Sequence, residues 1–195
     1  MNEKELLQWL KNETDDPFFK VFDKYFKDVT EDYQRAIEVA SIPHWFDEGI
    51  FKGIVDKDIQ HDPADLYKFV TEMPFCESYD ARNGYNVKKA IRLAVRIRLM
   101  CERPERFEEL SARAAEAFTG HNLTYEVERI FHLLWTDAAF AGEKILALEN
   151  ELARDSAKSL ALASSFQECK TVDCAKYPLV FGLSLIHISE PTRPY

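Results

Sequence analysis

Apolar residues recur every three or four positions along most of the chain, a spacing that places them on one face of a helix. Residues suited to capping a helix stand before several of these segments, and Thr30, Asp47 and Asp62 each precede one. Pro63 suits a first helical turn, where the backbone N–H group has no partner inside the helix. In the first half of the chain the pattern predicts helices over 18–26, 30–41, 47–55 and 63–73.

The clearest strand signal follows the fourth of these helices. Phe75–Tyr79 is a short, aromatic-flanked segment, and Asn83 followed by Gly84 is a dipeptide typical of tight turns. Gly84–Val87 is then predicted to return as a second strand. We therefore expect one small β-hairpin in an otherwise helical chain.

Helical spacing resumes after the hairpin. Pro104 begins a helix with Phe107 and Phe118 on its apolar stripe, and Gly120 ends this helix. Further helices are predicted over 88–101, 123–135, 139–153 and 155–169. Short connections between helices are typical of antiparallel pairs. The expected fold class is mainly α, with one hairpin-containing module followed by stacked helix pairs.

Composition and charge narrow the possible partners. The 195 residues are 46% hydrophobic, which is enough for a folded core. Acidic residues outnumber Lys and Arg by 34 to 25, for a net charge of -9. An acidic surface repels phosphate backbones, so nucleic acid is a disfavoured partner. We also expect no secretory signal and no membrane span, because no suitable apolar run is present.

The cysteines indicate a reducing compartment. Cys76, Cys101, Cys169 and Cys174 are far apart, except for the last two. Free thiols of this kind are typical of the cytoplasm, which is the expected location. Zinc sites usually need two clustered ligand pairs, and a second pair is missing. We therefore expect no metal site.

The last residues break the helical pattern. Leu183–Arg193 reads LSLIHISEPTR and resembles a translated sequencing adapter. We therefore expect residues 183–195 to be non-native and residues 176–195 to form a disordered tail. The resemblance also implies that the natural gene continues past Gly182 and that the chain is a truncated N-terminal piece.

Several segments resemble one family of signalling proteins. Ala36–Asp47 reads AIEVASIPHWFD and resembles the segment that enters the winged helix of STAND-type signalling ATPases, as does Met73–Glu77. Arg103–Ala115 and Glu128–Leu134 resemble the linker into the tetratricopeptide-like (TPR-like) helices of the same proteins. The resemblance implies a lead-in segment over 1–16, a winged-helix module over 17–101 and the start of TPR-like repeats over 104–175.

The resemblance also implies a function. In that family the winged helix packs on a P-loop nucleotide-binding domain, and the repeats sense a ligand or partner. The chain is then a non-enzymatic signalling fragment that binds a protein partner or its own ATPase domain. It contains no P-loop motif and no nucleophile–base arrangement, so we expect no cofactor and no catalytic residue. The alternatives are part of a maltose-activator-like transcriptional regulator and a direct DNA-binding winged helix.

A basic run follows the predicted hairpin. Lys88, Lys89, Arg92 and Arg96 recur at a spacing that places them on one helix face. They are the candidate contacts to a phosphate or a protein partner; the alternative is a solvated face that pairs with the chain's many acids. Many members of the resembled family carry a Met-His-Asp triplet here, whereas this chain has Val87 and the two lysines.

Two aromatic positions have a functional and a structural interpretation. Trp45 is either a stacking platform or part of the core, and the core is favoured because large aromatic side chains mostly serve packing. His132 lies between two apolar residues on a predicted helix. That position is typical of a packed histidine rather than of a catalytic base.

Overall fold

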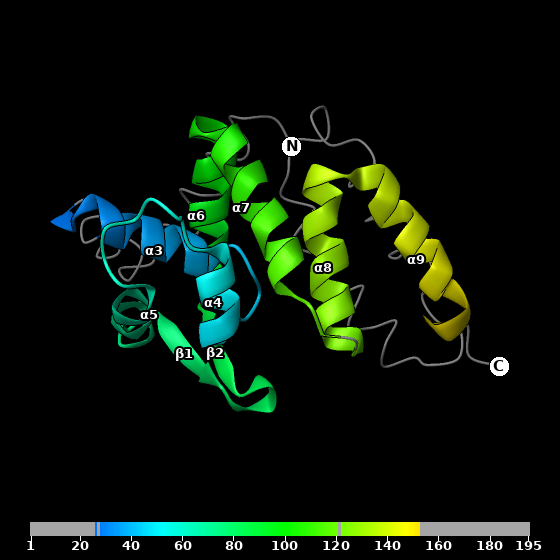
Figure 1. The fold of residues 1–195 in the computed structure, drawn as a ribbon, viewed down its shortest axis with the longest axis horizontal. Helices are drawn as coiled ribbons and strands as arrows, with labels where there is room; N and C mark the ends of the chain where they lie inside the picture. The colour runs from blue at the N-terminus through cyan, green and yellow to red at the C-terminus, as the bar shows by residue number, and fades with distance from the viewer. Residues whose placement is uncertain (1–25, 27, 121, 153–195) are drawn as a thin grey trace.

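The computed structural model describes residues 26, 28–120 and 122–152, and this part of the chain is mainly helical (Figure 1). It contains seven α-helices and one two-stranded sheet within the described residues. The α-helices are α3 (Glu31–Ser41), α4 (Glu48–Ile54), α5 (Pro63–Thr71), α6 (Lys89–Glu102), α7 (Pro104–Ala117), α8 (Leu123–Thr136) and α9 (Ala138–Leu152). The predicted fold class, mainly α with one small hairpin, is confirmed.

The described helices lie where the sequence predicts them, with ends that differ by one or two residues. The helices predicted over 18–26 and 155–169 fall almost wholly outside the described residues. The lead-in over 1–16 and the tail over 176–195 lie outside them entirely.

Side-chain caps explain where two of the short helices begin. The Asp47 carboxylate accepts a hydrogen bond of 2.8 Å from the backbone N–H of Ile50, at the start of α4. The Asp62 carboxylate accepts one of 2.7 Å from the backbone N–H of Ala64, at the start of α5. Thr30 occupies the corresponding position before α3, but its side chain makes no capping bond. Two of the three predicted caps are therefore confirmed.

The hairpin is formed by β1 (Cys76–Tyr79) and β2 (Gly84–Val87), which pair antiparallel. The connection covers the residues left between the two predicted strands, and it contains a 3₁₀ turn over Asp80–Arg82 that precedes Asn83. Asn83 has a left-handed backbone with φ of 50°, whereas Gly84 does not have a positive φ. A two-residue Asn-Gly turn has positive φ at both central residues, so this connection is not a turn of that kind. The predicted hairpin is confirmed, and Asn83 and Gly84 serve it in different ways.

Gly84 is needed for a different reason. A Cβ atom at this position would lie 2.6 Å from the carbonyl oxygen of Phe46. Phe46 and Tyr85 exchange two backbone hydrogen bonds of 2.8 Å, which form an isolated antiparallel bridge. The segment that enters α4 thus runs against the outer edge of β2, and only a residue without a side chain fits between them.

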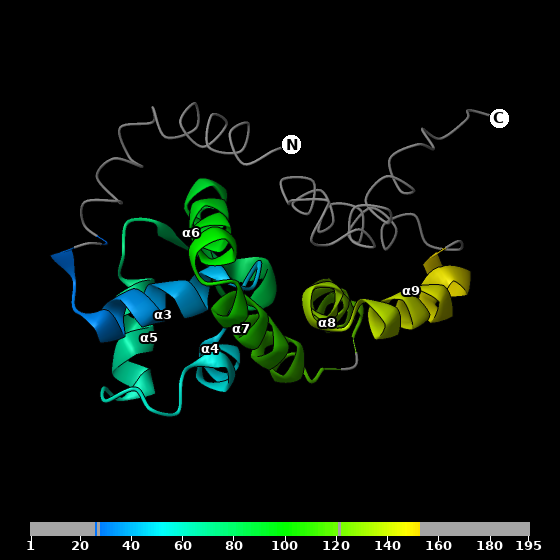
Figure 2. The ribbon, with the colours of Figure 1, turned by 90° about the horizontal axis from the view of Figure 1, so that it is seen from above.

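The elements form two groups that lie side by side (Figures 1 and 2). One group, here called the N-terminal unit, consists of α3, α4, α5 and the hairpin. The other consists of α6, α7, α8 and α9, in which each helix packs on the next. α7 lies between α8 and the N-terminal unit, and it packs closely on α4 as well as on α6 and α8. This helix therefore carries most of the contact between the two groups.

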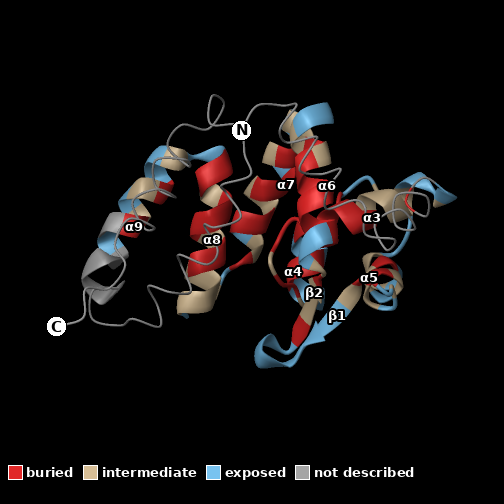
Figure 3. Ribbon diagram, turned by 180° about the vertical axis from the view of Figure 1, so that it is seen from behind, coloured by how far each residue is buried: buried red, intermediate tan, exposed pale blue. Residues whose placement is uncertain are grey.

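The hydrophobic core is continuous across the two groups (Figure 3). Its fully buried aromatic side chains include Phe46 and Phe51 from the N-terminal unit, and Phe107 and Phe131 from α7 and α8. Trp45 is 3% exposed and His132 is 1% exposed, so both are core residues, as the sequence favours. The buried face of the helical group is therefore completed by residues of the N-terminal unit.

Candidate functional site

The predicted basic face on α6 does not exist as one exposed surface. Lys89 is exposed, and Lys88 is half-buried with its Nζ atom 3.5 Å from a carboxylate oxygen of Glu77. Arg92 and Arg96 are 7% and 3% exposed, and both belong to the interior. The expectation of a shared solvent face is therefore wrong for these two arginines, because α6 packs on both α3 and α7 and is covered on more than one side.

Arg96 ties the end of α3 to the rest of the structure. Its Nε atom donates hydrogen bonds of 3.0 Å to the carbonyl oxygens of Ser41 and Ile42. The last carbonyl groups of a helix have no partner inside the helix, and they favour a nearby cation. The Arg96 guanidinium also lies 4.9 Å from the centre of the Phe131 ring. One side chain of α6 thus contacts both α3 and α8.

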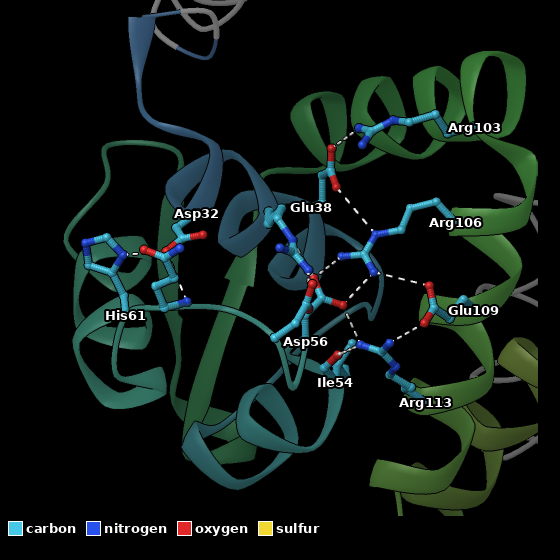
Figure 4. Close-up of polar contacts among 12 residues, drawn as sticks. Asp32, Glu38, Ile54, Asp56, His61, Arg103, Arg106, Glu109 and Arg113 are labelled. Carbon is cyan, nitrogen blue, oxygen red and sulfur yellow. Dashed lines mark hydrogen bonds and ion pairs between the residues drawn. The ribbon is translucent and has the colours of Figure 1, made fainter.

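A buried carboxylate joins the N-terminal unit to α7 (Figure 4). Asp56 lies just after α4, and its side chain is 1% exposed. It accepts hydrogen bonds from Arg35 of α3, at 2.8 Å, and from Arg113 of α7, at 2.5 Å. Arg106 of α7 donates to both carboxylate oxygens, once at 2.5 Å and once at shorter range. We call these four residues the arginine joint.

The arginine joint extends along the contact between α3 and α7. Glu38 of α3 is 2% exposed and pairs with Arg103, and its other oxygen lies 3.9 Å from Arg106 Nε. On the outer side, Glu109 binds Arg113 and lies 3.3 Å from Arg106 Nη1. The three α7 residues Arg106, Glu109 and Arg113 are three and four positions apart, which places them on one helix face. Acidic and basic groups therefore alternate along the whole contact.

The electrostatics of the joint favour an ionised Asp56. Burial raises the pKa of this carboxyl group, but the hydrogen bonds from Arg106 and Arg113 outweigh that effect and hold the pKa at about 2. The carboxylate is therefore charged at neutral pH. Its three cationic partners come from two elements that are far apart in the sequence.

A second buried polar cluster joins the N-terminal unit to α8. The Nδ1 atom of His44, in the connection between α3 and α4, lies 3.0 Å and 3.1 Å from the two carboxylate oxygens of Glu128. The backbone N–H of His44 donates a further bond of 3.3 Å to Glu128. His132, one turn further along α8, has its Nε2 atom 3.7 Å from the same carboxylate. We call these three residues the histidine joint.

Burial dominates the chemistry of the histidine joint. It lowers the pKa of His132 to about 3, against the opposing attraction of Glu128. Burial raises the pKa of Glu128, but the charge of His44 and its hydrogen bond outweigh this and leave the pKa below its ordinary value. The ring of Phe118 stacks on His132, at 6.0 Å between ring centres and 16° between planes. His132 is therefore a neutral ring enclosed by the core.

Both joints are suited to holding helices in fixed positions. Within residues 26, 28–120 and 122–152, no group of three or more His, Cys, Asp or Glu side chains is arranged to hold a metal ion. None of the helices in that part of the chain has the length and apolarity that crossing a membrane requires.

The sequence interpretation identified neither joint. Arg35 and Asp56 are 21 positions apart, and His44 and Glu128 are 84 apart, so no local motif connects them. The only available signal was the spacing of Arg106 and Arg113 on one helix face, which also fits an ordinary solvated face. Comparisons of the chain with protein-family models, curated proteins and solved structures found no match.

Proposed function

We propose that the chain is a non-enzymatic interaction unit, in which a winged-helix module and the first helix pairs of a TPR-like array act as one rigid body. In the setting of a STAND-type protein, this body binds a protein partner or an ATPase domain of its own protein. The observation that carries the proposal is the arginine joint, in which a buried Asp56 receives hydrogen bonds from both α3 and α7.

A buried ion pair supports this role through its geometry. Removing charged groups from water costs several kcal/mol per ion, so such a pair is tolerated only in one well-defined arrangement. The Asp56 carboxylate requires α3, α4 and α7 to hold their positions together. A binding surface that spans both groups of helices then loses little conformational entropy when a partner binds.

The alternative of a direct DNA-binding winged helix receives less support. The segment from Asp62 to Glu72, which contains α5 and precedes the hairpin, carries three acidic residues and one lysine. A helix that enters a DNA groove meets phosphates on both sides, and this segment would repel them. Of the four basic candidates in α6 and directly before it, only Lys88 and Lys89 reach the surface, because Arg92 and Arg96 are buried.

The test is affinity capture from cells of the source organism, with the chain as bait and a parallel measurement of duplex-DNA binding at low salt. We expect a protein to be captured by the wild-type chain and to be lost with Asp56→Asn, which opens the arginine joint. Asp58→Ala is the matched control, because Asp58 also binds Arg35, at 2.6 Å, but has a side chain that is 79% exposed. It should retain the captured protein.

Two results would contradict the proposal. One is salt-dependent binding to duplex DNA that Lys89→Ala weakens, which would favour the DNA-binding alternative. The other is a captured protein that binds Asp56→Asn as well as it binds wild type, because a rigid joint would then be irrelevant to recognition. Circular dichroism of each bait is measured first, so that loss of capture is not confused with global unfolding.

A further inference from the structure

The histidine joint collects three titratable groups at a contact between two groups of helices. His44 comes from the segment after α3, and Glu128 and His132 come from α8. Of the neighbouring elements, α6 contributes the charge of Arg96 and α7 contributes the apolar ring of Phe118. Glu128 is the single anion within this set of ionisable groups.

The joint has no place for a further positive charge. The carboxylate of Glu128 already receives the ring and the backbone N–H of His44. Among the described residues, neither ring nitrogen of His132 has a hydrogen-bond partner, and its Nε2 atom is 3.7 Å from Glu128. A proton added to His132 would create a buried cation: burial opposes it most, the attraction of Glu128 offsets only part of that cost, and Arg96 and His44 repel it. Protonation therefore favours any arrangement in which His132 reaches water.

We propose that the histidine joint is an acid-sensitive latch: proton uptake by His132 releases α8 from the segment that carries His44, while the arginine joint keeps α7 on the N-terminal unit. The latch can be measured in the chain alone, so the inference does not depend on which partner the protein binds. In a cell, the latch would make the α8 side of the structure responsive to a fall in pH.

The pH window follows from the two states of His132. Its pKa is about 3 in the closed joint and about 6.5 when the ring is in water, so the closed state holds the neutral form. A depressed histidine pKa contributes stability that is complete above pH 6.5 and is lost as the pH falls toward 3. Protonation of Glu128 removes further stability from the joint, but only below pH 4.5. Asp56 stays ionised until about pH 2, so the arginine joint persists throughout this window.

The test is hydrogen exchange of the full chain, measured by mass spectrometry between pH 7 and pH 5 and corrected for the intrinsic pH dependence of exchange. In wild type, local opening of α8 should become about twentyfold more frequent over this range, from the two pKa values of His132. Protection of α3 and α7 should stay constant. Circular dichroism at each pH shows whether the helices persist.

Two variants and one control decide the outcome. His132→Leu should remove most of the pH dependence of α8 protection, whereas His61→Gln should not change it. His61 is a suitable control because it also pairs with a carboxylate, that of Asp32 at 2.6 Å, but is 44% exposed. If His132→Leu does not fold, His132→Phe serves instead, because it keeps a flat ring against Phe118, and it should lose the pH dependence in the same way.

The proposal is overturned by any of three observations. The first is constant α8 protection in wild type from pH 7 to pH 5. The second is simultaneous loss of protection in α8, α3 and α7, which would be global acid unfolding rather than a latch. The third is an unchanged pH dependence in folded His132→Leu or, where that variant does not fold, in His132→Phe.

Discussion

Gly53 of α4 lies directly against Ala117 of α7, so that a Cβ atom at position 53 would stand 2.9 Å from the Ala117 Cβ atom. Real Cβ atoms do not approach so closely, and the two helices would have to move apart to admit one. The arginine joint lies beside this contact, because Asp56 follows α4 and two of its arginine partners belong to α7. Two small residues therefore allow α4 and α7 to pack closely enough for Asp56 to reach the arginines of α7.

Gly53→Ala should destabilise the protein, although alanine is the better helix former. Overpacking at a tight contact costs about 1–3 kcal/mol, which exceeds the gain of up to about 1 kcal/mol in helix propensity. Gly142→Ala is the matched control, because Gly142 lies inside α9 and nothing stands within 4 Å of its Cβ position. It should gain roughly 0.5–1 kcal/mol. Urea unfolding of both variants gives the comparison, and equal gains would contradict the close packing of α4 on α7.

Asp56→Asn should be among the most destabilising single changes at the contact between α7 and the N-terminal unit. It leaves Arg35, Arg106 and Arg113 without their shared anion. Breaking a buried pair costs about 3–5 kcal/mol, and the lower end applies because the arginines are partly exposed and regain some water. Asp58→Ala removes an exposed partner of Arg35 and should cause no measurable change. Chemical unfolding at pH 7 measures both, and similar costs for the two variants would contradict a buried joint.

The same carboxylate predicts a distinct pH dependence below pH 4. The pKa of Asp56 is held at about 2, below the ordinary value of 3.8. A depressed carboxyl pKa contributes stability that is present above pH 3.8 and is lost as the pH falls toward 2. The unfolding free energy of wild type should therefore fall more steeply over this range than that of Asp56→Asn. If the unfolding free energies of the two proteins fall in parallel, the pKa of Asp56 is not lowered by folding.

Local signals in the sequence were enough to place the helices and the hairpin. Asp47 and Asp62 cap α4 and α5 where their positions predict, because a cap depends only on residues within one turn. Asn83 and Gly84 mark the connection of the hairpin in the sequence, but in the structure they act separately. Asn83 supplies the left-handed conformation, whereas Gly84 is required by Phe46, which lies far away in the sequence.

The two polar joints also depend on residues that are far apart in the sequence, so local patterns do not predict them. Helical spacing assigns one inner face to each helix, and α6 is covered on more than one side, so Arg96 was placed in solvent. The ion pairs of Asp56 and Glu128 depend on how α7 and α8 pack against the N-terminal unit. Charged side chains are common on helix surfaces, and nothing in their spacing distinguishes the few that become buried.

Gly84→Ala and Asn83→Gly should have opposite effects on the hairpin. The alanine Cβ atom would meet the Phe46 carbonyl oxygen at 2.6 Å, and backbone cannot yield as a flexible side chain does. A loss of about 1–3 kcal/mol is expected from such a clash. Asn83 has a left-handed backbone with φ of 50°, and glycine tolerates that conformation better than any other residue. Asn83→Gly should therefore be neutral or stabilising. Thermal unfolding measures both, and a neutral Gly84→Ala would contradict the bridge between Phe46 and Tyr85.

Cys76 and Cys101 should differ in their reaction with thiol reagents. Burial raises the pKa of the Cys76 thiol to about 12, so almost none of it is thiolate at pH 8. Cys101 is exposed at the end of α6, where a reagent reaches it directly. Iodoacetamide at pH 8 should modify Cys101 more than about tenfold faster than Cys76, because the thiolate is the reactive form. Peptide mass spectrometry measures each site separately. Equal rates would show that the hairpin opens readily, whereas rates that become equal only in denaturant would show that burial alone protects Cys76.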